Sequence, residues 1–153
     1  MKQSTVTTKV VTYWITTSIL AFVLFSGGVG ELTHNWGTLE TVTILGYPTY
    51  FLTIIGVWKL LGAIALLAPR LPRLKEWVYA GIFFNMTGAA LSHAAMGDYG
   101  SYAFHLIVPT FFVVLAVVSW ALRPDSRTLG VIFPASPTPA IGFVDNQTLP
   151  VPR

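Results

Sequence analysis

The stretch WVYAGIFFNMTGAALSHAAMG, residues Trp77–Gly97, decides the fold that this sequence predicts. It is almost wholly apolar and, at about 20 residues, long enough to cross a bilayer as a helix. It nevertheless contains Asn85, Ser92 and His93, and Asp98 follows it directly. Because polar groups are costly in hydrocarbon, these side chains are expected to face protein or water rather than lipid. The stretch therefore predicts a membrane protein built around an internal polar site.

Composition places the chain among integral membrane proteins. Of its 153 residues, 54% are hydrophobic and 10% are charged, whereas a soluble domain carries about 25% charged residues. The net charge of +3 comes from scattered basic residues near helix ends, which indicates membrane topology rather than nucleic-acid binding. The chain has no cysteine, which excludes disulfides, thiol redox chemistry and cysteine-ligated metals within it.

Three further apolar stretches complete the predicted fold, an all-α four-helix transmembrane bundle within residues 1–127. Its helices are expected at about residues 10–30, 48–68, 74–96 and 102–122. A signal peptide competes with the first helix, but that apolar run is longer than a typical signal sequence, which favours a retained helix. Residues 32–47 are expected to form a loop. Residues 128–153 are rich in Pro, Ser and Thr, which is typical of an exposed C-terminal tail.

Basic residues predict the orientation of these helices. They precede the first helix, separate the second from the third, and follow the fourth: Lys2, Lys9, Arg70, Arg73, Lys75, Arg123 and Arg127. Since cytoplasmic loops carry an excess of Lys and Arg, both termini and the middle loop are expected in the cytoplasm. The outer half then holds all three histidines and the acids Glu31, Glu40 and Asp98. The cytoplasmic half is expected to hold almost no polar chemistry beyond its basic loops.

Lys59 is the charged residue nearest the middle of a predicted helix. An unpaired Lys at the bilayer centre costs about 2.5–3.5 kcal/mol, so it requires a partner. Glu31, at the end of the first helix, is the expected one. The pair either fixes the register of two helices or marks a working site, and the sequence leaves both interpretations open. Trp58, mid-helix beside Lys59, is expected to line a pocket.

His93, Asp98 and His105 form the second group of candidate residues. They lie across the end of the third helix and the start of the fourth, close enough in sequence to reach one space. A histidine held by an acid can serve as a general base, a proton carrier or a metal ligand. The spacing matches no standard metal motif, so no metal ligand is assigned, and a haem between the two histidines is favoured still less. Asn85 is expected to hydrogen-bond between helices.

The run from Lys59 to Asp98 resembles the DoxX-like family of small bacterial membrane proteins. The matching features are Lys59, the turn at Gly62–Pro69, Glu76-Trp77, Gly81, Gly88-Ala89, Ser92-His93, Gly97-Asp98 and the ending at Ser119–Pro124. The resemblance covers about residues 10–124. It implies a four-helix bundle in a bacterial inner membrane. It also implies a link to membrane redox complexes, since the family takes its name from a subunit of a thiosulfate:quinone oxidoreductase.

Three functions are compatible with these residues. The favoured one is a redox-associated subunit whose outer-half pocket binds a quinone or another lipophilic molecule, with a quinone favoured over haem or metal as cofactor. The ligand-binding residues would be Lys59, Trp58, Asn85 and His105, and the proton-handling or catalytic residues Glu31, His93 and Asp98. The second is a self-sufficient isomerase, cyclase or hydrolase that uses the same three groups for acid–base catalysis. The third is a small proton-coupled transporter, with Glu31 as its proton-binding acid.

Several partners follow from the favoured function. The helices require a lipid bilayer, and the pocket requires a lipophilic small molecule. Without a flavin or dinucleotide fingerprint in the chain, electrons must come from a bound cofactor or a partner. The expected protein partner is therefore a redox subunit or a second copy of the chain, and nucleic acid is not expected.

Overall fold

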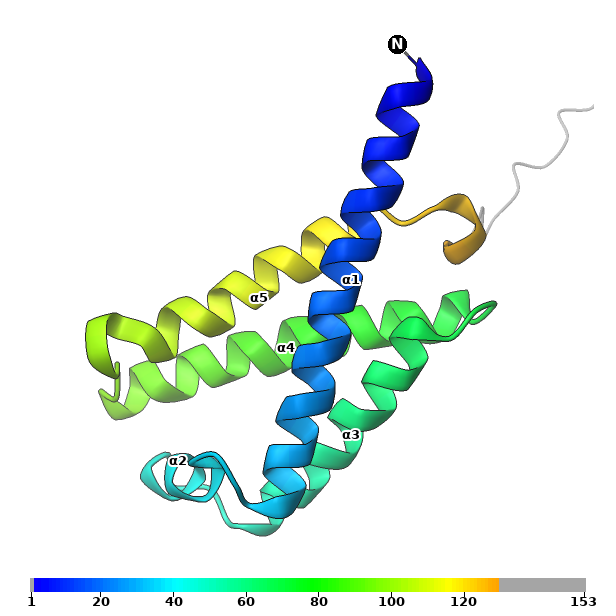
Figure 1. Cartoon of the computed structure of the whole chain (residues 1–153). Helices are drawn as coiled ribbons and strands as arrows, with labels where there is room; N and C mark the ends of the chain where they lie inside the picture. The colour runs from blue at the N-terminus through cyan, green and yellow to red at the C-terminus, as the bar shows by residue number, and fades with distance from the viewer. Residues whose placement is uncertain (1, 130–153) are drawn as a thin grey trace, which may run out of the picture.

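The computed structural model describes the backbone of residues 2–129 and the side chains of residues 6–129. Within that range all regular secondary structure is helical and there are no strands, which confirms the all-α prediction. Its α-helices are α1 Lys2–Thr33, α2 Thr38–Ile44, α3 Tyr50–Leu67, α4 Pro72–Met96 and α5 Phe104–Ala121 (Figure 1). Two short 3-10 turns, η1 Ser101–Ala103 and η2 Asp125–Arg127, flank α5.

The helices differ from the prediction in number and in length. Five α-helices replace the expected four, because α2 occupies part of residues 32–47, which were expected to form a loop. A helix of seven residues makes about two turns, which is too short for a periodic hydrophobic pattern to reveal it. The first helix begins at Lys2 rather than near residue 10. Apart from its first two residues, the expected tail lies outside the described residues.

Among the described residues, three helical segments are long and apolar enough to cross a membrane: Val6–Thr33, Tyr50–Leu67 and Ser101–Ala121. The helix α4 has 25 residues, so its length would also suffice. It is less apolar than the other three because charged residues occupy its first turns and polar residues interrupt its C-terminal half. The expected count of four membrane spans therefore depends on α4.

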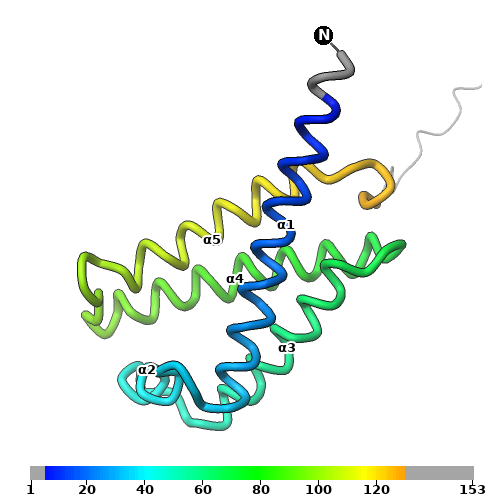
Figure 2. Tube along the Cα trace, viewed as in Figure 1, coloured from blue at the N-terminus to red at the C-terminus, as the bar shows by residue number. Residues whose placement is uncertain are grey.

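The long helices pack as two crossed pairs rather than as an evenly packed bundle. The helix α1 packs along α3, α4 packs along α5, and α1 also contacts α5. The pairs cross one another in Figures 1 and 2. Apolar side chains fill the crossing, among them Leu20, Leu24, Leu66, Ile82 and Ala116. Although α3 and α4 are consecutive, they contact one another much less than the paired helices do, which leaves space between them.

Two glycines bring α1 and α3 into backbone contact. A Cβ atom added to Gly28 would lie 2.9 Å from the carbonyl oxygen of Gly56, and one added to Gly56 would lie 3.0 Å from that of Gly28. This is the close approach that small residues permit between membrane helices. Because Glu31 and Lys59 each lie one turn beyond a contacting glycine, the same contact brings their side chains together.

A buried polar network joins three helices near the end that carries the basic loops. The hydroxyl of Ser119 on α5 lies 2.8 Å from that of Thr17 on α1 and 2.9 Å from that of Tyr79 on α4. All three side chains are buried. The prediction that this half holds almost no polar chemistry is therefore wrong. Isolated hydroxyls in apolar helices gave no sequence signal, because any of them could have bonded to its own helix backbone.

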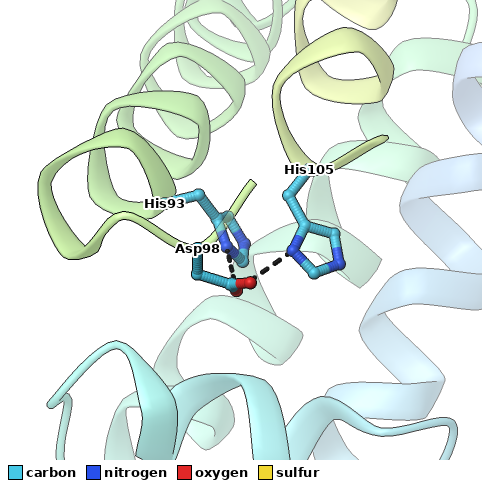
Figure 3. A group of neighbouring side chains, drawn as sticks. All are labelled: His93, Asp98 and His105. Carbon is cyan, nitrogen blue, oxygen red and sulfur yellow. Dashed lines mark hydrogen bonds and ion pairs between the residues drawn. The ribbon is translucent and has the colours of Figure 1, made fainter. Parts of the chain in front are cut away.

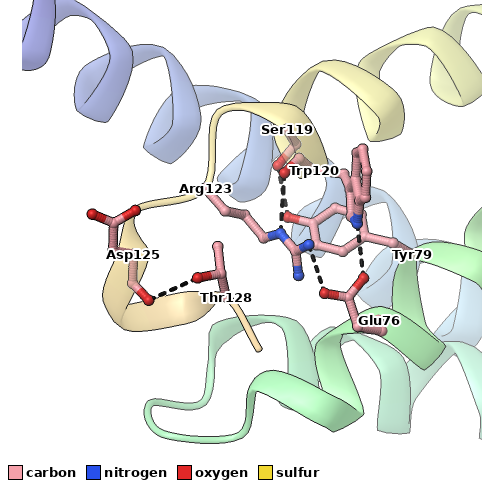
Figure 4. A network of polar contacts seen from close by, with 7 residues as sticks. All are labelled: Glu76, Tyr79, Ser119, Trp120, Arg123, Asp125 and Thr128. Atoms are coloured by element: carbon pink, nitrogen blue, oxygen red, sulfur yellow. Dashed lines mark hydrogen bonds and ion pairs between the residues drawn. The ribbon is translucent and has the colours of Figure 1, made fainter. Parts of the chain in front are cut away.

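A salt bridge lies beside this network (Figure 4). Arg123 donates to Glu76 Oε1 over 2.7 Å, and the indole nitrogen of Trp120 donates to Glu76 Oε2 over 2.8 Å. The guanidinium also lies 5.1 Å from the centre of the Tyr79 ring. These contacts connect the start of α4 to the end of α5, so the two ends are held in register.

Replacing Ser119 with alanine is expected to lower the free energy of unfolding by about 1–3 kcal/mol, because two buried hydroxyls lose their shared partner. The matched control is Thr110→Ala on the same helix, where an exposed hydroxyl donates to the carbonyl of Leu106. That variant is expected to stay within about 0.5 kcal/mol of the parent protein. Denaturant titration in mild detergent measures both. Equal losses in the two variants would show that the buried network contributes nothing specific.

Candidate functional site

Glu31 and Lys59 form an ion pair between the end of α1 and the middle of α3. The ammonium group donates to Glu31 Oε1, as the sequence predicted. The side chains are 13% and 17% exposed, so water screens the pair little. The other carboxylate oxygen, Glu31 Oε2, is buried without a hydrogen-bond partner among the described residues. The pair therefore has one unused acceptor.

A cavity of about 310 Å³ adjoins this ion pair. It lies at the end of the helices away from the basic loops, and we call it the outer cavity. Four of the predicted site residues line it: Glu31, Lys59, Asn85 and His93. Its walls come from the end of α1, from α2 and α3, and from the outer half of α4. Gly88 also lines it, and nothing lies within 4 Å of where a Cβ atom on Gly88 would be. The volume is at the lower end of the range for small-molecule sites.

Asn85 faces open space instead of bonding to another helix. Its side chain makes no hydrogen bond to any described residue, so the expected interhelical hydrogen bond is not formed. Asn85 instead lines the outer cavity and a second cavity that lies next to it, between α3 and α4. An amide with a free donor and a free acceptor beside a cavity is suited to bind a ligand oxygen.

The second cavity lies between α3 and α4, where the two helices separate. Its volume is about 670 Å³, and its lining is mostly apolar. It shares Ile55, Lys59 and Asn85 with the outer cavity, so the two spaces meet at these side chains. Trp58 lines this second cavity rather than the outer one, and its side chain is largely exposed. The predicted pocket is thus divided into a polar outer part and an apolar inner part.

His93, Asp98 and His105 form a compact cluster at the outer ends of α4 and α5 (Figure 3). The Nδ1 atoms of the two histidines donate to the same oxygen, Asp98 Oδ2, over 2.9 and 3.0 Å. The two rings are 4.5 Å apart between centroids. The hydrogen bond from His93, supported by His105, holds the pKa of the Asp98 carboxyl below its usual value. Of the three, His93 alone lines the outer cavity.

A tight turn creates this cluster. Gly97 ends α4 in the left-handed conformation, with φ of 68°, and the Asp98 amide then donates back to the His93 carbonyl over 3.0 Å. This is a common way to close a helix, and glycine adopts it without strain. Gly100, with φ of 63°, leaves room for the His105 ring, which a Cβ atom would approach to 3.0 Å.

Two residues of the outer cavity, Trp36 and Tyr47, were missed in the sequence. Trp36 covers Gly30 so closely that a Cβ atom there would lie 2.5 Å from the indole ring. Tyr47 also lines the cavity, and its hydroxyl lies 2.8 Å from that of Ser92. Both residues belong to residues 32–47, which were expected to form a loop. The sequence therefore gave no reason to expect them beside α4. His34, by contrast, is exposed and belongs to neither site.

These observations define a multi-pass helical membrane protein with an internal polar cavity. The model of the DoxX-like family matches residues 15–122, so the chain belongs to that family. No curated protein and no solved structure matched the chain.

Proposed function

We propose that this protein is a redox-associated membrane subunit that binds a quinone or a similar lipophilic molecule in its outer cavity. In this proposal α4 is a fourth membrane span, both termini are cytoplasmic, and the membrane is a bacterial inner membrane. Two features support the fourth span: the length of α4 and its packing along α5, which is itself apolar enough to cross a membrane. The basic residues support the orientation.

The connection between the two cavities carries the proposal. A lipophilic ligand has an apolar body and a few polar atoms. The second cavity, called the inner cavity from here on, has a volume of about 670 Å³ and a mostly apolar lining. The outer cavity is lined by an ion pair, an amide and a histidine. Such a division suits a molecule that enters between α3 and α4 from the bilayer and points its polar end outward.

The polar end of the site fits the chemistry of a quinone. Quinone oxygens accept hydrogen bonds, and Lys59 and Asn85 supply donors where the cavities meet. Reduction of a quinone adds two electrons and two protons. His93, which Asp98 orients, and Glu31, whose second oxygen is unpaired, would exchange those protons with the outer side. The electrons would come from a partner subunit or a bound cofactor, because the chain has no thiol and no flavin or dinucleotide fingerprint.

Short-chain ubiquinone tests the proposal in purified protein held in lipid nanodiscs. Titration is expected to quench tryptophan fluorescence, because Trp36 lines the outer cavity and Trp58 the inner one. Mass spectrometry of the protein purified in mild detergent is expected to detect a retained lipophilic molecule. Turnover of a lipophilic substrate without any partner would instead favour a self-sufficient acid–base enzyme, and proton-dependent flux in liposomes would favour a transporter.

Replacing Gly88 with leucine is expected to weaken quinone binding at least about tenfold, which is about 1.4 kcal/mol. The new side chain would extend into the outer cavity, because beyond its own stretch of helix nothing lies within 4 Å of the added Cβ. Thr87→Leu adds the same side chain at the neighbouring position, which lines neither cavity, and is expected to bind as the parent does. Equal affinities for both variants would place the ligand elsewhere.

A further inference from the structure

We propose that His93, Asp98 and His105 bind a divalent first-row transition metal at the outer end of α4 and α5. Two imidazoles and one carboxylate form a ligand set that such ions use in proteins, with coordination positions left for water or a substrate. The inference concerns a metal ion beside the outer cavity and does not depend on the lipophilic ligand.

The distances within the cluster fit a shared ion. Ligand bonds of about 2.1 Å that meet at a right angle place their two ligand atoms about 3.0 Å apart. The Nδ1 atoms of His93 and His105 lie 2.9 and 3.0 Å from Asp98 Oδ2, and one ligand atom from each residue falls within 4.8 Å of the others. An ion can therefore replace the protons of these two hydrogen bonds after small movements of the side chains.

The cluster is also held in place before any ion binds. The ring of His93 is buried, and the Gly97 turn returns Asp98 to it. His105 stands over Gly100 at the start of α5. A site whose ligands are already gathered loses little conformational entropy on binding, so its affinity is higher than that of scattered surface histidines.

The charges of the surroundings favour a cation. Two neutral imidazoles and one carboxylate together carry a charge of −1. Lys59, the cation that lines the neighbouring cavity, is neutralised by Glu31. A divalent ion would therefore meet a net attractive field. Because His93 belongs to both sites, an ion held there would stand at the edge of the outer cavity.

A purely structural role for the cluster makes a different prediction. If the histidines only brace the turn between α4 and α5 by sharing the carboxylate, the protein has no stoichiometric affinity for metal ions. Replacing His105 would then alter stability alone. Metal affinity therefore separates the two roles without any assay of activity.

The experiment uses the full chain, freed of metal with a chelator and titrated in mild detergent with Zn²⁺ and with Co²⁺. We expect one ion per chain, and visible Co²⁺ bands typical of nitrogen and oxygen ligands. His105→Ala and Asp98→Asn are each expected to lower the affinity at least about 100-fold, since loss of groups that only support a ligand already costs 10–100-fold.

His34→Ala is the matched control, because His34 is the remaining histidine and its side chain is exposed. It is expected to bind the ion as the parent does. Thermal unfolding of each variant without metal checks the fold, and the partial exposure of His105 makes its replacement mild. Substoichiometric binding, or an affinity that His105→Ala leaves unchanged, would overturn the proposal. So would an equal loss in His34→Ala, which would identify nonspecific binding to surface histidines.

Discussion

Replacing Glu31 with alanine is expected to lower the free energy of unfolding by about 3–5 kcal/mol, because it leaves the ammonium group of Lys59 buried without a counter-charge. The side chain of Lys59 is 17% exposed, so it has little access to water. It also extends along α1, with its Nζ atom 3.6 Å from where a Cβ atom on Gly27 would lie. The loss is measured by denaturant titration in mild detergent.

A double variant separates the loss of the pair from the burial of a lone charge. Glu31→Leu combined with Lys59→Met removes both charges and keeps the apolar volume, so most of the lost stability is expected to return. The single variant Lys59→Met leaves a carboxylate that can take up a proton, so its cost is expected to be smaller. If the double variant is as unstable as Glu31→Ala, the stability comes from the shape of these side chains rather than from their charges.

The Glu31–Lys59 pair also shows what the sequence was able to predict. A lysine deep in an apolar helix requires a partner whatever the details of packing, and one acid stood at a plausible depth. The helical class followed in the same way, because long apolar runs have few alternatives in a bilayer. The short spacing from His93 to His105 likewise placed the cluster at one end of two neighbouring helices.

Other features depended on how the helices cross, which no local pattern encodes. The buried contacts of Ser119 with Thr17 and Tyr79 join residues far apart in sequence, and each hydroxyl alone resembles a side chain bonded to its own helix. The separation of α3 from α4 created the inner cavity and left Asn85 without a partner helix. Trp36 and Tyr47 reached the outer cavity because a short helix formed where a loop was expected.

Lys75 is the residue whose sequence interpretation was most incomplete. It was interpreted as a topology signal, together with Arg70 and Arg73. In the structure its side chain is fully buried. The ammonium group donates to the carbonyls of Ala65, Leu66 and Ala68 at the end of α3, over 2.9, 2.7 and 2.5 Å. The last carbonyls of a helix have no hydrogen-bond partner within it and carry partial negative charge. A cation at this position supplies the missing hydrogen bonds and interacts favourably with that charge.

Replacing Lys75 with methionine is therefore expected to lower the free energy of unfolding by about 3 kcal/mol. Hydrogen bonds to charged groups contribute about 1.5–3 kcal/mol each, and the desolvation of the ammonium offsets part of their sum. Arg73→Met is the matched control: it removes the same charge from the first turn of the same helix, α4, but its side chain is exposed. It is expected to cost less than about 0.5 kcal/mol. Because both variants weaken the positive-inside signal equally, a loss of stability confined to Lys75→Met would identify its contacts with α3 as the cause. Equal losses of stability in the two variants would show that the contacts of Lys75 with α3 contribute nothing specific and that Lys75 acts only as a topology signal.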